Sequence, residues 1–387
     1  MSKKPGFDVP RTCLVTGGSG FVGQRLVEML VERGCKRVIS FDIAPMPKDG
    51  WQRDEIEYVR GDLTDSEFIM NLCSKKWILN KKEGEIGIEC VFHIAALVGP
   101  YHHKDVYRKV NYDGSLNILN ACKAYNIKRI VMSSSPSTRF PYPDPNVYNK
   151  TEEELFKINN GDFAPVFLQP YAETKALGEK IVRDACGTDD NDLLTVAVAP
   201  HQVYGPRDGL FLPNLLDAAG SGKLRIFGNG LNRISFCHVD NYCHGLILGH
   251  EALYSGSPAL GKFYIITDGP GVIFWKVLDQ CIMAMGFDSL WAKMKLPTWL
   301  MMGLAYLCVF IGKIWHIVTG TPEHVINFKL KLIPFSVKML VIDREFNIAG
   351  AKRDLKYEPV VSFEQGWGQT IDWFKDNWLP KYLAGNK

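Results

Sequence analysis

The feature that most constrains the fold is the glycine-rich segment "TGGSGFVG" at residues 16–23. It follows a short apolar run, "RTCLVTG", and precedes "FVGQRLVEMLVERG", where apolar residues recur every four positions until a glycine ends the pattern. Gly17, Gly20 and Gly23 therefore lie in a predicted strand–loop–helix unit. Glycine there permits a tight turn, close approach of the backbone to a pyrophosphate and close packing of helix on strand. The helix amino terminus would also offer N–H groups to that anion, so the segment predicts a dinucleotide site.

An acidic residue at the end of the next apolar run strengthens this prediction. Asp42 in "ISFDI" lies 19 residues beyond Gly23. A carboxylate at this place accepts hydrogen bonds from both ribose hydroxyls and repels a 2′-phosphate, which favours NAD over NADP. No arginine follows Asp42 directly. The alternative role for Asp42 is that of a strand-end cap.

The first half of the chain alternates apolar runs with helical patterns, and this alternation predicts the fold class. The runs are apolar on both faces, as in parallel strands buried between two helix layers. Helical patterns lie between several of them, for example at Val106–Tyr125 and Ala172–Ala185. We therefore expect an α/β fold with a Rossmann-type, doubly wound parallel sheet. The further strand candidates are "RVISFDI", "IEYVRGD", "ECVFHIAA", "KRIVMSSS" and "LLTVAVAP".

At 387 residues the chain exceeds the usual size of one hydrophobic core, so we expect two lobes. Residues 1–205 are predicted to form the NAD-binding Rossmann domain. Residues 206–387 are predicted to form a smaller, mostly helical substrate lobe, from which the chain partly returns to the first domain around 232–268. Two polar stretches, 74–87 and 142–165, look like insertions, and the second has the length of a functional lid or flexible excursion.

One segment departs from an ordinary globular pattern. Residues 296–312, "LPTWLMMGLAYLCVFIG", carry no charged side chain. As a helix the segment would be about 26 Å long, slightly shorter than the roughly 30 Å hydrocarbon core of a bilayer. A buried helix of the second lobe is one interpretation. A membrane-associating segment with Trp299 and Trp315 as interfacial anchors is the other, and a complete span is a third.

Charge and cysteine usage narrow the range of partners. The formal net charge of +3 is small, and the Lys and Arg residues are dispersed, so no nucleic-acid partner is expected. The ten cysteines show no Cys-x-x-Cys spacing, which indicates reduced thiols of an intracellular protein and no metal site. The amino terminus, "MSKKPGFDVP", lacks the apolar run of a secretory signal peptide.

The stretch "QPYAETKALGEK" at residues 169–180 places Tyr171 and Lys175 four residues apart in a predicted helix. Residues with this spacing lie on one helix face. A phenol has an ordinary pKa of about 10, and a neighbouring ammonium favours the phenolate and lowers that pKa. The pair could therefore remove a proton from an alcohol. Spacing alone leaves an ordinary amphipathic helix as the alternative.

These motifs occur in an order that resembles the extended short-chain dehydrogenase/reductase superfamily and, within it, most closely the 3β-hydroxysteroid dehydrogenase family. The resemblance runs from Thr12 to Trp378, with the two polar insertions outside it. Each motif is modestly specific, and the ordered series is highly specific. The series is "TGGSGFVG", "FDI", "GDLTD", "FHIAA", "VNYDGSLNIL", "SSS", "YAETK", "APHQVYGPRD", "FCHVDNYCHGLIL" and the carboxy-terminal "AKRDLKYEP" with "SFEQGWGQTIDW".

The resemblance implies a set of cofactor-binding residues. Acidic and apolar side chains would line the adenine pocket, small residues after the fourth strand would lie against the cofactor, and two residues near 200 would present backbone to the nicotinamide. One asparagine would support the active-site geometry. The implied set is Gly17, Gly20, Phe21, Val22, Gly23, Asp42, Asp62, Leu63, Ala95, Ala96, Asn111, Tyr171, Lys175, Pro200 and Val203.

The resemblance also implies a catalytic serine at the end of the fifth strand. Alignment with the family pattern favours Ser135, with Ser134 as the alternative. Tyr171 would accept the substrate proton, Lys175 would lower the pKa of its phenol and reach the nicotinamide ribose, and the serine hydroxyl would orient the substrate oxygen. NAD would carry the hydride. Structural roles are expected for His93, His201, His238 and His244.

Within the family, "YAETK" and "APHQVYGPRD" look closest to the branch of decarboxylating sterol-4α-carboxylate 3-dehydrogenases. This implies oxidation of the 3β-hydroxyl of a 4α-carboxysterol, followed by loss of carbon dioxide from the resulting β-keto acid, in sterol biosynthesis. Ala199 departs from the pattern, where the family commonly has arginine.

A membrane-resident sterol would suit peripheral or monotopic attachment to the cytosolic face of the endoplasmic reticulum or a lipid droplet, with a cytoplasmic location as the alternative. The sequence is also compatible with a homodimer and does not decide the oligomeric state. The other candidate functions are a 3β-hydroxy-Δ5-steroid dehydrogenase/isomerase, a nucleotide-sugar epimerase and a non-catalytic scaffold that binds the cofactor.

Overall fold

The computed structural model describes residues 9–79, 84–99, 102–141, 143–155, 167–323, 325–326 and 332–385. Its centre is a seven-stranded sheet in the order β13-β9-β7-β6-β1-β2-β3, in which every neighbouring pair is parallel. Strand order reverses at β1, as in doubly wound sheets. The strands are β1 (Thr12–Thr16), β2 (Arg37–Asp42), β3 (Ile56–Arg60), β6 (Cys90–His93), β7 (Arg129–Ser133), β9 (Leu194–Pro200) and β13 (Phe263–Ile266).

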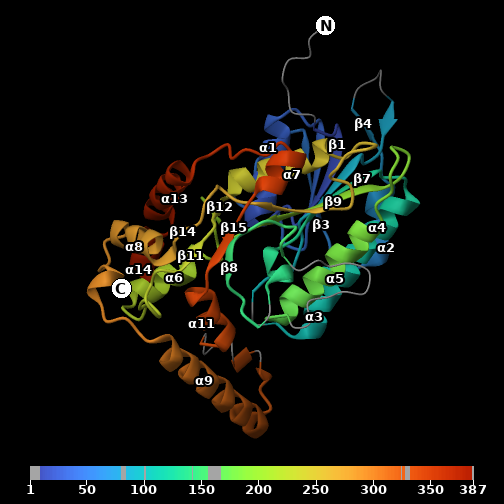
Figure 1. The fold of residues 1–387 in the computed structure, drawn as a ribbon. Helices are drawn as coiled ribbons and strands as arrows, with labels where there is room; N and C mark the ends of the chain where they lie inside the picture. Colours follow the sequence, from blue (N-terminus) through green and yellow to red (C-terminus); the bar gives the residue numbers. More distant parts are fainter. Residues whose placement is uncertain are drawn as a thin grey trace.

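Helices cover both faces of this sheet, which confirms the predicted fold class (Figure 1). On one face α1 packs against α7, and on the other α4 packs against both α2 and α5. Each layer encloses its own apolar core, so the central strands are apolar on both faces, as the sequence predicted. The helices are α1 (Phe21–Glu32), α2 (Ser66–Ser74), α4 (Gly114–Ala124), α5 (Pro170–Asp184) and α7 (Val239–Glu251).

The helix expected at Val106–Tyr125 is not a single α-helix. It consists of α3 (Lys104–Arg108), a π-helical turn (Lys109–Asp113) and α4, which follow one another without a break. A π-helical turn adds a residue to the helical repeat and is frequent at functional sites. Here it contains Asn111, which the resemblance implies for the active site.

The second lobe is built around aromatic packing and a small four-stranded sheet. The sheet has the order β14-β11-β15-β8, and β10 pairs separately with β12. Side chains from α6, α8 and α13 form the core of the lobe together with Tyr204 and Phe236. The elements are β8 (Val147–Lys150), β10 (Val203–Tyr204), β11 (Arg233–Ile234), β12 (Cys237–His238), β14 (Val272–Ile273), β15 (Arg344–Phe346), α6 (Leu212–Gly220), α8 (Phe274–Ala284), α13 (Phe363–Asn377) and α14 (Leu379–Gly385). The short helix α12 (Ala349–Asp354) packs instead on β13 of the seven-stranded sheet.

The two polar stretches contain short strands. In 74–87, β4 (Trp77–Ile78) pairs with β5 (Glu85–Ile86) as a two-stranded antiparallel unit. In 142–165, β8 pairs in parallel with β15, so this part of the chain belongs to the sheet of the second lobe. Residues 80–83, 142 and 156–166, on which a lid would partly depend, lie outside the described residues.

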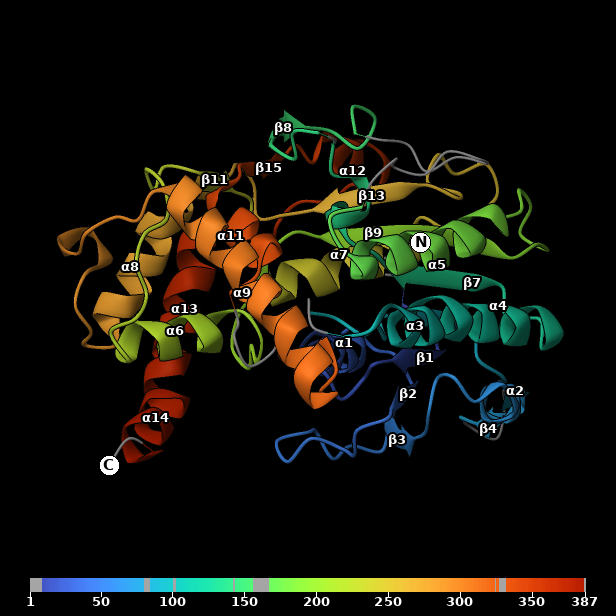
Figure 2. The same cartoon turned by 90° about the horizontal axis from the view of Figure 1, so that it is seen from below.

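The apolar segment forms a longer and more exposed helix than the sequence predicted. It is α9 (Thr298–Thr319), 22 residues long, with only Met301, Ala305 and Gly312 buried. The interpretation of residues 296–312 as a buried helix is therefore wrong. By length and composition α9 is able to cross a membrane, although one such helix is weak support for a span. It lies below the body of the molecule in Figure 1 and in front of it in Figure 2, where it packs on α11 (Pro334–Val341).

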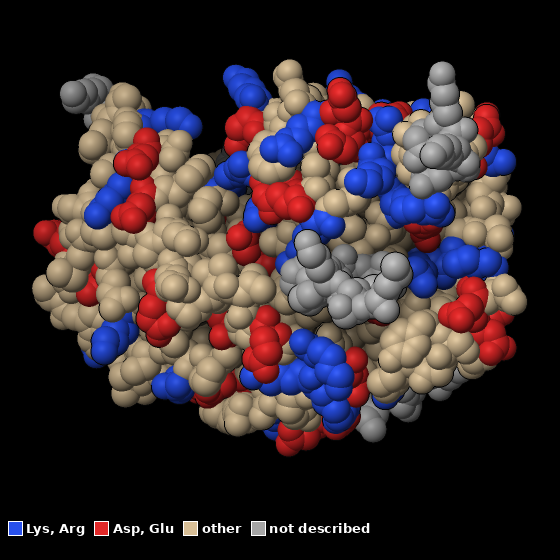
Figure 3. Space-filling view, turned by 90° about the horizontal axis from the view of Figure 1, so that it is seen from above, with Lys and Arg blue, Asp and Glu red and all other residues tan. Residues whose placement is uncertain are grey.

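Charged side chains do not gather by sign on the face shown in Figure 3. Lysine and arginine side chains alternate with aspartate and glutamate over the right part of this face, and its left part carries fewer charges.

Candidate active site

The glycine loop joins β1 to α1 in a conformation that larger residues would disturb. Gly17 has a φ of +74°, and a Cβ atom there would lie 2.9 Å from the backbone nitrogen of Ala95. A Cβ on Gly23 would lie 1.9 Å from the carbonyl oxygen of Gly17. Gly20 precedes α1, whose amino terminus receives no hydrogen bond from a capping side chain. The loop thus combines close packing with a helix terminus suited to an anionic phosphate.

Asp42 lies beside this loop, at the end of β2. One carboxylate oxygen accepts a hydrogen bond from the N–H of Ser19 at 3.1 Å, and the other accepts from the N–H of Ala44 at 2.9 Å. These are the contacts of a strand-end cap, the alternative role. They also hold the carboxylate next to the glycine loop, where a nucleotide ribose would lie. Ribose binding by Asp42 stays a prediction.

The remaining adenine-side residues differ in exposure. Asp62 is exposed and accepts a hydrogen bond from the N–H of Thr64 at 2.8 Å. The Leu63 side chain is buried in the core between the sheet and its helices, and its carbonyl accepts from Asn117. Leu63 would therefore meet a nucleotide through its backbone, because its side chain faces the protein interior.

Asn111 connects the loop after β6 to the start of α5. Its side-chain oxygen accepts from the N–H of Leu97 at 2.8 Å, and its amide nitrogen donates to the carbonyl of Leu97 at 3.2 Å and to Thr174 at 3.3 Å. Ala95 and Ala96 in the same loop are half-buried, and the Thr16 hydroxyl accepts a hydrogen bond from the N–H of Ala95. The side chain of Asn111 thus fixes the loop relative to the helix that carries the tyrosine.

Three adjacent serines end β7, and each has a different partner. The Ser133 hydroxyl accepts from Tyr242 at 2.7 Å. The Ser134 hydroxyl donates to the buried carboxylate of Glu179 at 2.5 Å. Ser135 forms a side-chain hydrogen bond with Tyr171 and also contacts the Ser137 hydroxyl at 2.8 Å. Ser135 is therefore the serine of this run that faces Tyr171.

Tyr171 lies in the first turn of α5, and Lys175 lies one turn later. The ring of Tyr107 on α3 packs edge-on against the Tyr171 ring, with 6.2 Å between centroids. Burial raises the pKa of Tyr171 to about 12; the hydrogen bond from Ser135 opposes this shift. Burial lowers the pKa of Lys175 to about 8, and the carboxylate of Glu179 opposes that shift. Tyr171 is therefore a desolvated phenol, and its neighbour Lys175 is still mostly charged at neutral pH.

The sheet brings these loops to one edge. Gly17, Ala95, Ser135 and Pro200 each lie at or just beyond the carboxyl end of β1, β6, β7 or β9, four strands that are neighbours in the sheet. Pro200 and Val203 are half-buried there. Ligands of doubly wound folds bind outside this edge. The structure thus gathers the predicted residues from distant parts of the sequence.

The four histidines make contacts that need no proton transfer. Both ring nitrogens of His93 lie within 3 Å of hydroxyls, those of Thr16 and Ser115, and burial lowers the pKa of His93 to about 3. The other three contact backbone or arginine groups. His201 contacts the Ser235 carbonyl and Arg344, the His238 side chain caps α7, and His244 contacts Arg33.

Two residues beside the serine and the tyrosine were not singled out from the sequence. Glu179 is fully buried, and Arg139 follows Ser135 in a 3-10 turn (Pro136–Arg139) and forms an ion pair with Glu179. Glu179 lies four residues after Lys175, a helical spacing that was visible in the sequence. Its pairing with Arg139, across 40 residues, was not visible.

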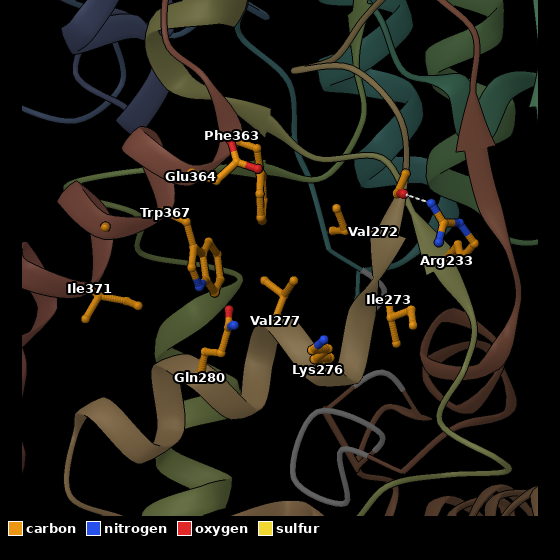
Figure 4. A pocket seen from close by; sticks show the side chains of 12 residues that line it. Arg233, Val272, Ile273, Lys276, Val277, Gln280, Phe363, Glu364, Trp367 and Ile371 are labelled. Carbon is orange, nitrogen blue, oxygen red and sulfur yellow. Dashed lines mark hydrogen bonds between the residues drawn. The ribbon is translucent and has the colours of Figure 1, made fainter.

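A separate cleft of about 560 Å³ lies in the second lobe, between β14, α8 and α13. Figure 4 shows that aromatic, aliphatic and charged side chains meet around it, with Trp367 above Gln280 and Arg233 bonded to a backbone carbonyl. The residues predicted for catalysis or cofactor binding do not line this cleft.

Comparisons with known proteins agree with this arrangement. A "3beta-hydroxysteroid-dehydrogenase/decarboxylase isoform 2" of Arabidopsis thaliana is 31% identical over 385 residues, which is 95% of this chain and 62% of that protein. This chain thus spans less than two thirds of that relative. The human "Sterol-4-alpha-carboxylate 3-dehydrogenase, decarboxylating" is 30% identical, with 94% of this chain and 88% of that protein covered.

Among solved structures, the UDP-glucose 4-epimerase of Thermotoga maritima superposes with a TM-score of 0.64 at 21% identity, covering 94% of this chain and 99% of that one. At this identity the likeness concerns the fold alone. Residues 14–297, most of the chain, match the 3-beta hydroxysteroid dehydrogenase/isomerase family. The match confirms the predicted oxidoreductase class. The chain belongs to the 3-beta hydroxysteroid dehydrogenase/isomerase family.

Proposed function

We propose that this protein uses NAD to oxidise the 3β-hydroxyl of a 4α-carboxysterol, with loss of the carboxylate as carbon dioxide. The observation that carries the proposal is the hydrogen bond between Ser135 and Tyr171, with Lys175 one turn away at the edge where the glycine loop lies. The names of the Arabidopsis and human relatives support the choice of substrate.

Tyr171, Ser135 and Lys175 have different roles in the proposed alcohol oxidation. The Tyr171 phenolate accepts the hydroxyl proton, and the Ser135 hydroxyl donates to the substrate oxygen and orients it. Lys175 favours the phenolate because its ammonium lies on the same helix face. NAD held at the glycine loop would supply the hydride acceptor for carbon 3. Because burial, opposed by the hydrogen bond with Ser135, raises the pKa of Tyr171 to about 12, the phenolate would depend on the positive charges of Lys175 and of the bound nicotinamide.

The residues of the glycine loop fit a dinucleotide. The uncapped amino terminus of α1 suits the pyrophosphate, and the Asp42 carboxylate beside the loop suits ribose hydroxyls and opposes a 2′-phosphate. The resulting 3-ketone is β to the carboxylate, so carbon dioxide leaves as its electrons flow into the new carbonyl. The electron pair of the broken bond forms an enolate, whose oxygen the Ser135 hydroxyl and the now protonated Tyr171 would stabilise, and a proton from solvent at carbon 4 completes the ketone; no metal is required.

The substrate assignment is tested by incubating the purified protein with NAD and either a 4α-carboxysterol or a 3β-hydroxy-Δ5-steroid. We expect NADH and carbon dioxide from the carboxysterol. A Tyr171→Phe variant should have at least about 1,000-fold lower kcat, and its NAD affinity should stay within about threefold of the parent. NADH without carbon dioxide would contradict the decarboxylating assignment. Enone formation from the Δ5-steroid, with no turnover of the carboxysterol, would favour the dehydrogenase/isomerase alternative.

We also propose that α9 attaches the protein to the cytosolic face of the endoplasmic reticulum or a lipid droplet, where sterols reside. Its exposed side chains include Trp299, Leu307, Phe310 and Trp315, and the helix is otherwise poor in charge. Burying such a surface in the interfacial layer removes apolar area from water, and Trp at the ends suits the headgroup region.

The attachment is tested by co-sedimentation with phosphatidylcholine vesicles. Leu307→Lys with Phe310→Lys should lower the bound fraction at least about tenfold, because two charges would enter an apolar layer. Ile78→Lys is the matched control, since Ile78 is 67% exposed but lies in the β4–β5 unit of the first lobe. Equal binding of all three proteins would contradict attachment through α9.

A further inference from the structure

A buried ionic cluster lies directly behind the serine and the tyrosine. Glu179 is at its centre and has no exposed surface, and Arg139 is 3% exposed. Arg139 donates to both carboxylate oxygens of Glu179, one of them at 2.8 Å, and Arg183 donates to the carboxylate at 3.1 Å. Ser134 donates to it as well, at 2.5 Å. All oxygens of the carboxylate are therefore engaged in charge-assisted or hydroxyl hydrogen bonds.

The cluster joins the two segments that carry the predicted catalytic groups. Ser134 directly follows β7 and precedes Ser135, and Arg139 is the last residue of the 3-10 turn that follows Ser135. Glu179 lies on α5, one turn beyond Lys175 and two turns beyond Tyr171, so all three share a helix face. A shift of one segment relative to the other would strain several buried hydrogen bonds at once.

The cluster also sets the charge that Lys175 faces. Lys175 is 2% exposed, and the Glu179 carboxylate is the group that favours its ammonium. Arg139 and, on α5 itself, Arg183 also lie against the Glu179 carboxylate, Tyr107 on α3 packs on the Tyr171 ring, and the neutral His93 on β6 lies close enough to Lys175 to feel its charge. Other charged groups on the packed helical segments are Asp105 and Arg108 on α3, Lys109 and Asp113 in the π-helical turn, and Lys123 on α4. Lys104 on α3 pairs with Glu173 at the exposed side of α5.

We propose that Glu179, held by Arg139 and Ser134, is a positioning residue for the reaction: it sets Ser135 against Tyr171 and supplies the negative charge that keeps Lys175 an ammonium. The inference rests on the proposed alcohol oxidation, because it concerns how the same three groups are held. Glu179 itself does not touch the reacting atoms.

A pH profile separates this role from a merely structural one. Without the carboxylate, Lys175 would lose its proton at lower pH, and the phenolate would lose its supporting charge there. In Glu179→Gln the alkaline decline of kcat/KM should therefore begin about one pH unit lower, and kcat should fall about 10- to 100-fold. The KM for NAD should change less than about threefold.

Two further variants make the test decisive. Ser134→Ala removes one hydrogen bond and no charge, so it should lower kcat about fivefold and leave the pH profile in place. Asp184→Asn is the matched control, because it removes the exposed ion pair with Lys180 on the same helix and should leave both quantities unchanged.

The outcomes distinguish the inference from the function on which it rests. A folded Glu179→Gln protein with parental kcat and pH profile would overturn the inference. If Glu179→Gln fails to fold, Ser134→Ala with parental kcat would overturn it. Parental activity of Tyr171→Phe would instead overturn the proposed function, whatever Glu179→Gln does.

Discussion

Three neighbouring serine hydroxyls, at residues 133–135, have three different partners. Ser133 meets Tyr242 on α7, Ser134 meets Glu179 on α5, and Ser135 meets Tyr171. The sequence limited the catalytic serine to Ser135 or Ser134. It gave no geometric reason to prefer one of them, because the partners of the three serines lie 36 to 109 residues away along the chain.

Ser135→Ala should lower kcat by about 100- to 1,000-fold, because the substrate oxygen would lose its orienting donor. Binding of NADH, followed by its fluorescence, should stay unchanged. Ser133→Ala is the matched control and should keep kcat within about threefold, while costing about 1 kcal/mol of unfolding free energy from the lost contact with Tyr242. Parental turnover by Ser135→Ala would contradict the assignment.

At the scale of elements, the conformation of the loop between β1 and α1 depends on the close packing of α1 against this loop. Gly23→Ala would place a Cβ 1.9 Å from the Gly17 carbonyl, so α1 would have to move away from the loop. We expect at least about tenfold weaker NAD binding and about 1–3 kcal/mol lower stability, measured by calorimetry. Gly368→Ala on α13 meets no atom within 4 Å and should be neutral or slightly stabilising. Equal NAD affinity of both variants would contradict this account.

The sequence predicted the Rossmann elements well because their signals are local. Each strand of the sheet except β13 was recognised as an apolar run, and the helix at 172–185 lies within one or two residues of α5. The sheet of the second lobe was missed, because β11, β14 and β15 are two or three residues long and pair across up to 197 residues. The exposure of α9 could not be predicted from the sequence either, because periodicity does not distinguish a buried apolar helix from an exposed one.

At the scale of the whole molecule, buried neutral histidines couple stability to pH. Burial lowers the pKa of His93 and of His250 to about 3, below the ordinary value of about 6.5 in the unfolded chain. A lowered histidine pKa means that the unfolded chain binds more protons, so stability is complete above pH 6.5 and declines as the pH falls towards 3.

Urea unfolding at pH 7.5 and 5.5 checks this expectation. His93→Gln should lose about 1 kcal/mol less than the parent between these two pH values, because one buried histidine no longer resists protonation. His103→Gln, at an exposed cap of α3, should behave like the parent. An identical pH dependence in the parent and His93→Gln would show that His93 is not held neutral by burial.

The most direct test of the central claim follows the hydrogen on carbon 3 of the substrate. A 4α-carboxysterol with deuterium at the 3α position, incubated with NAD and this protein, should give deuterated NADH and carbon dioxide in a one-to-one ratio by mass spectrometry. Tyr171→Phe should give neither product at a measurable rate. NADH without deuterium, or deuterium transfer without carbon dioxide, would contradict the proposed oxidative decarboxylation.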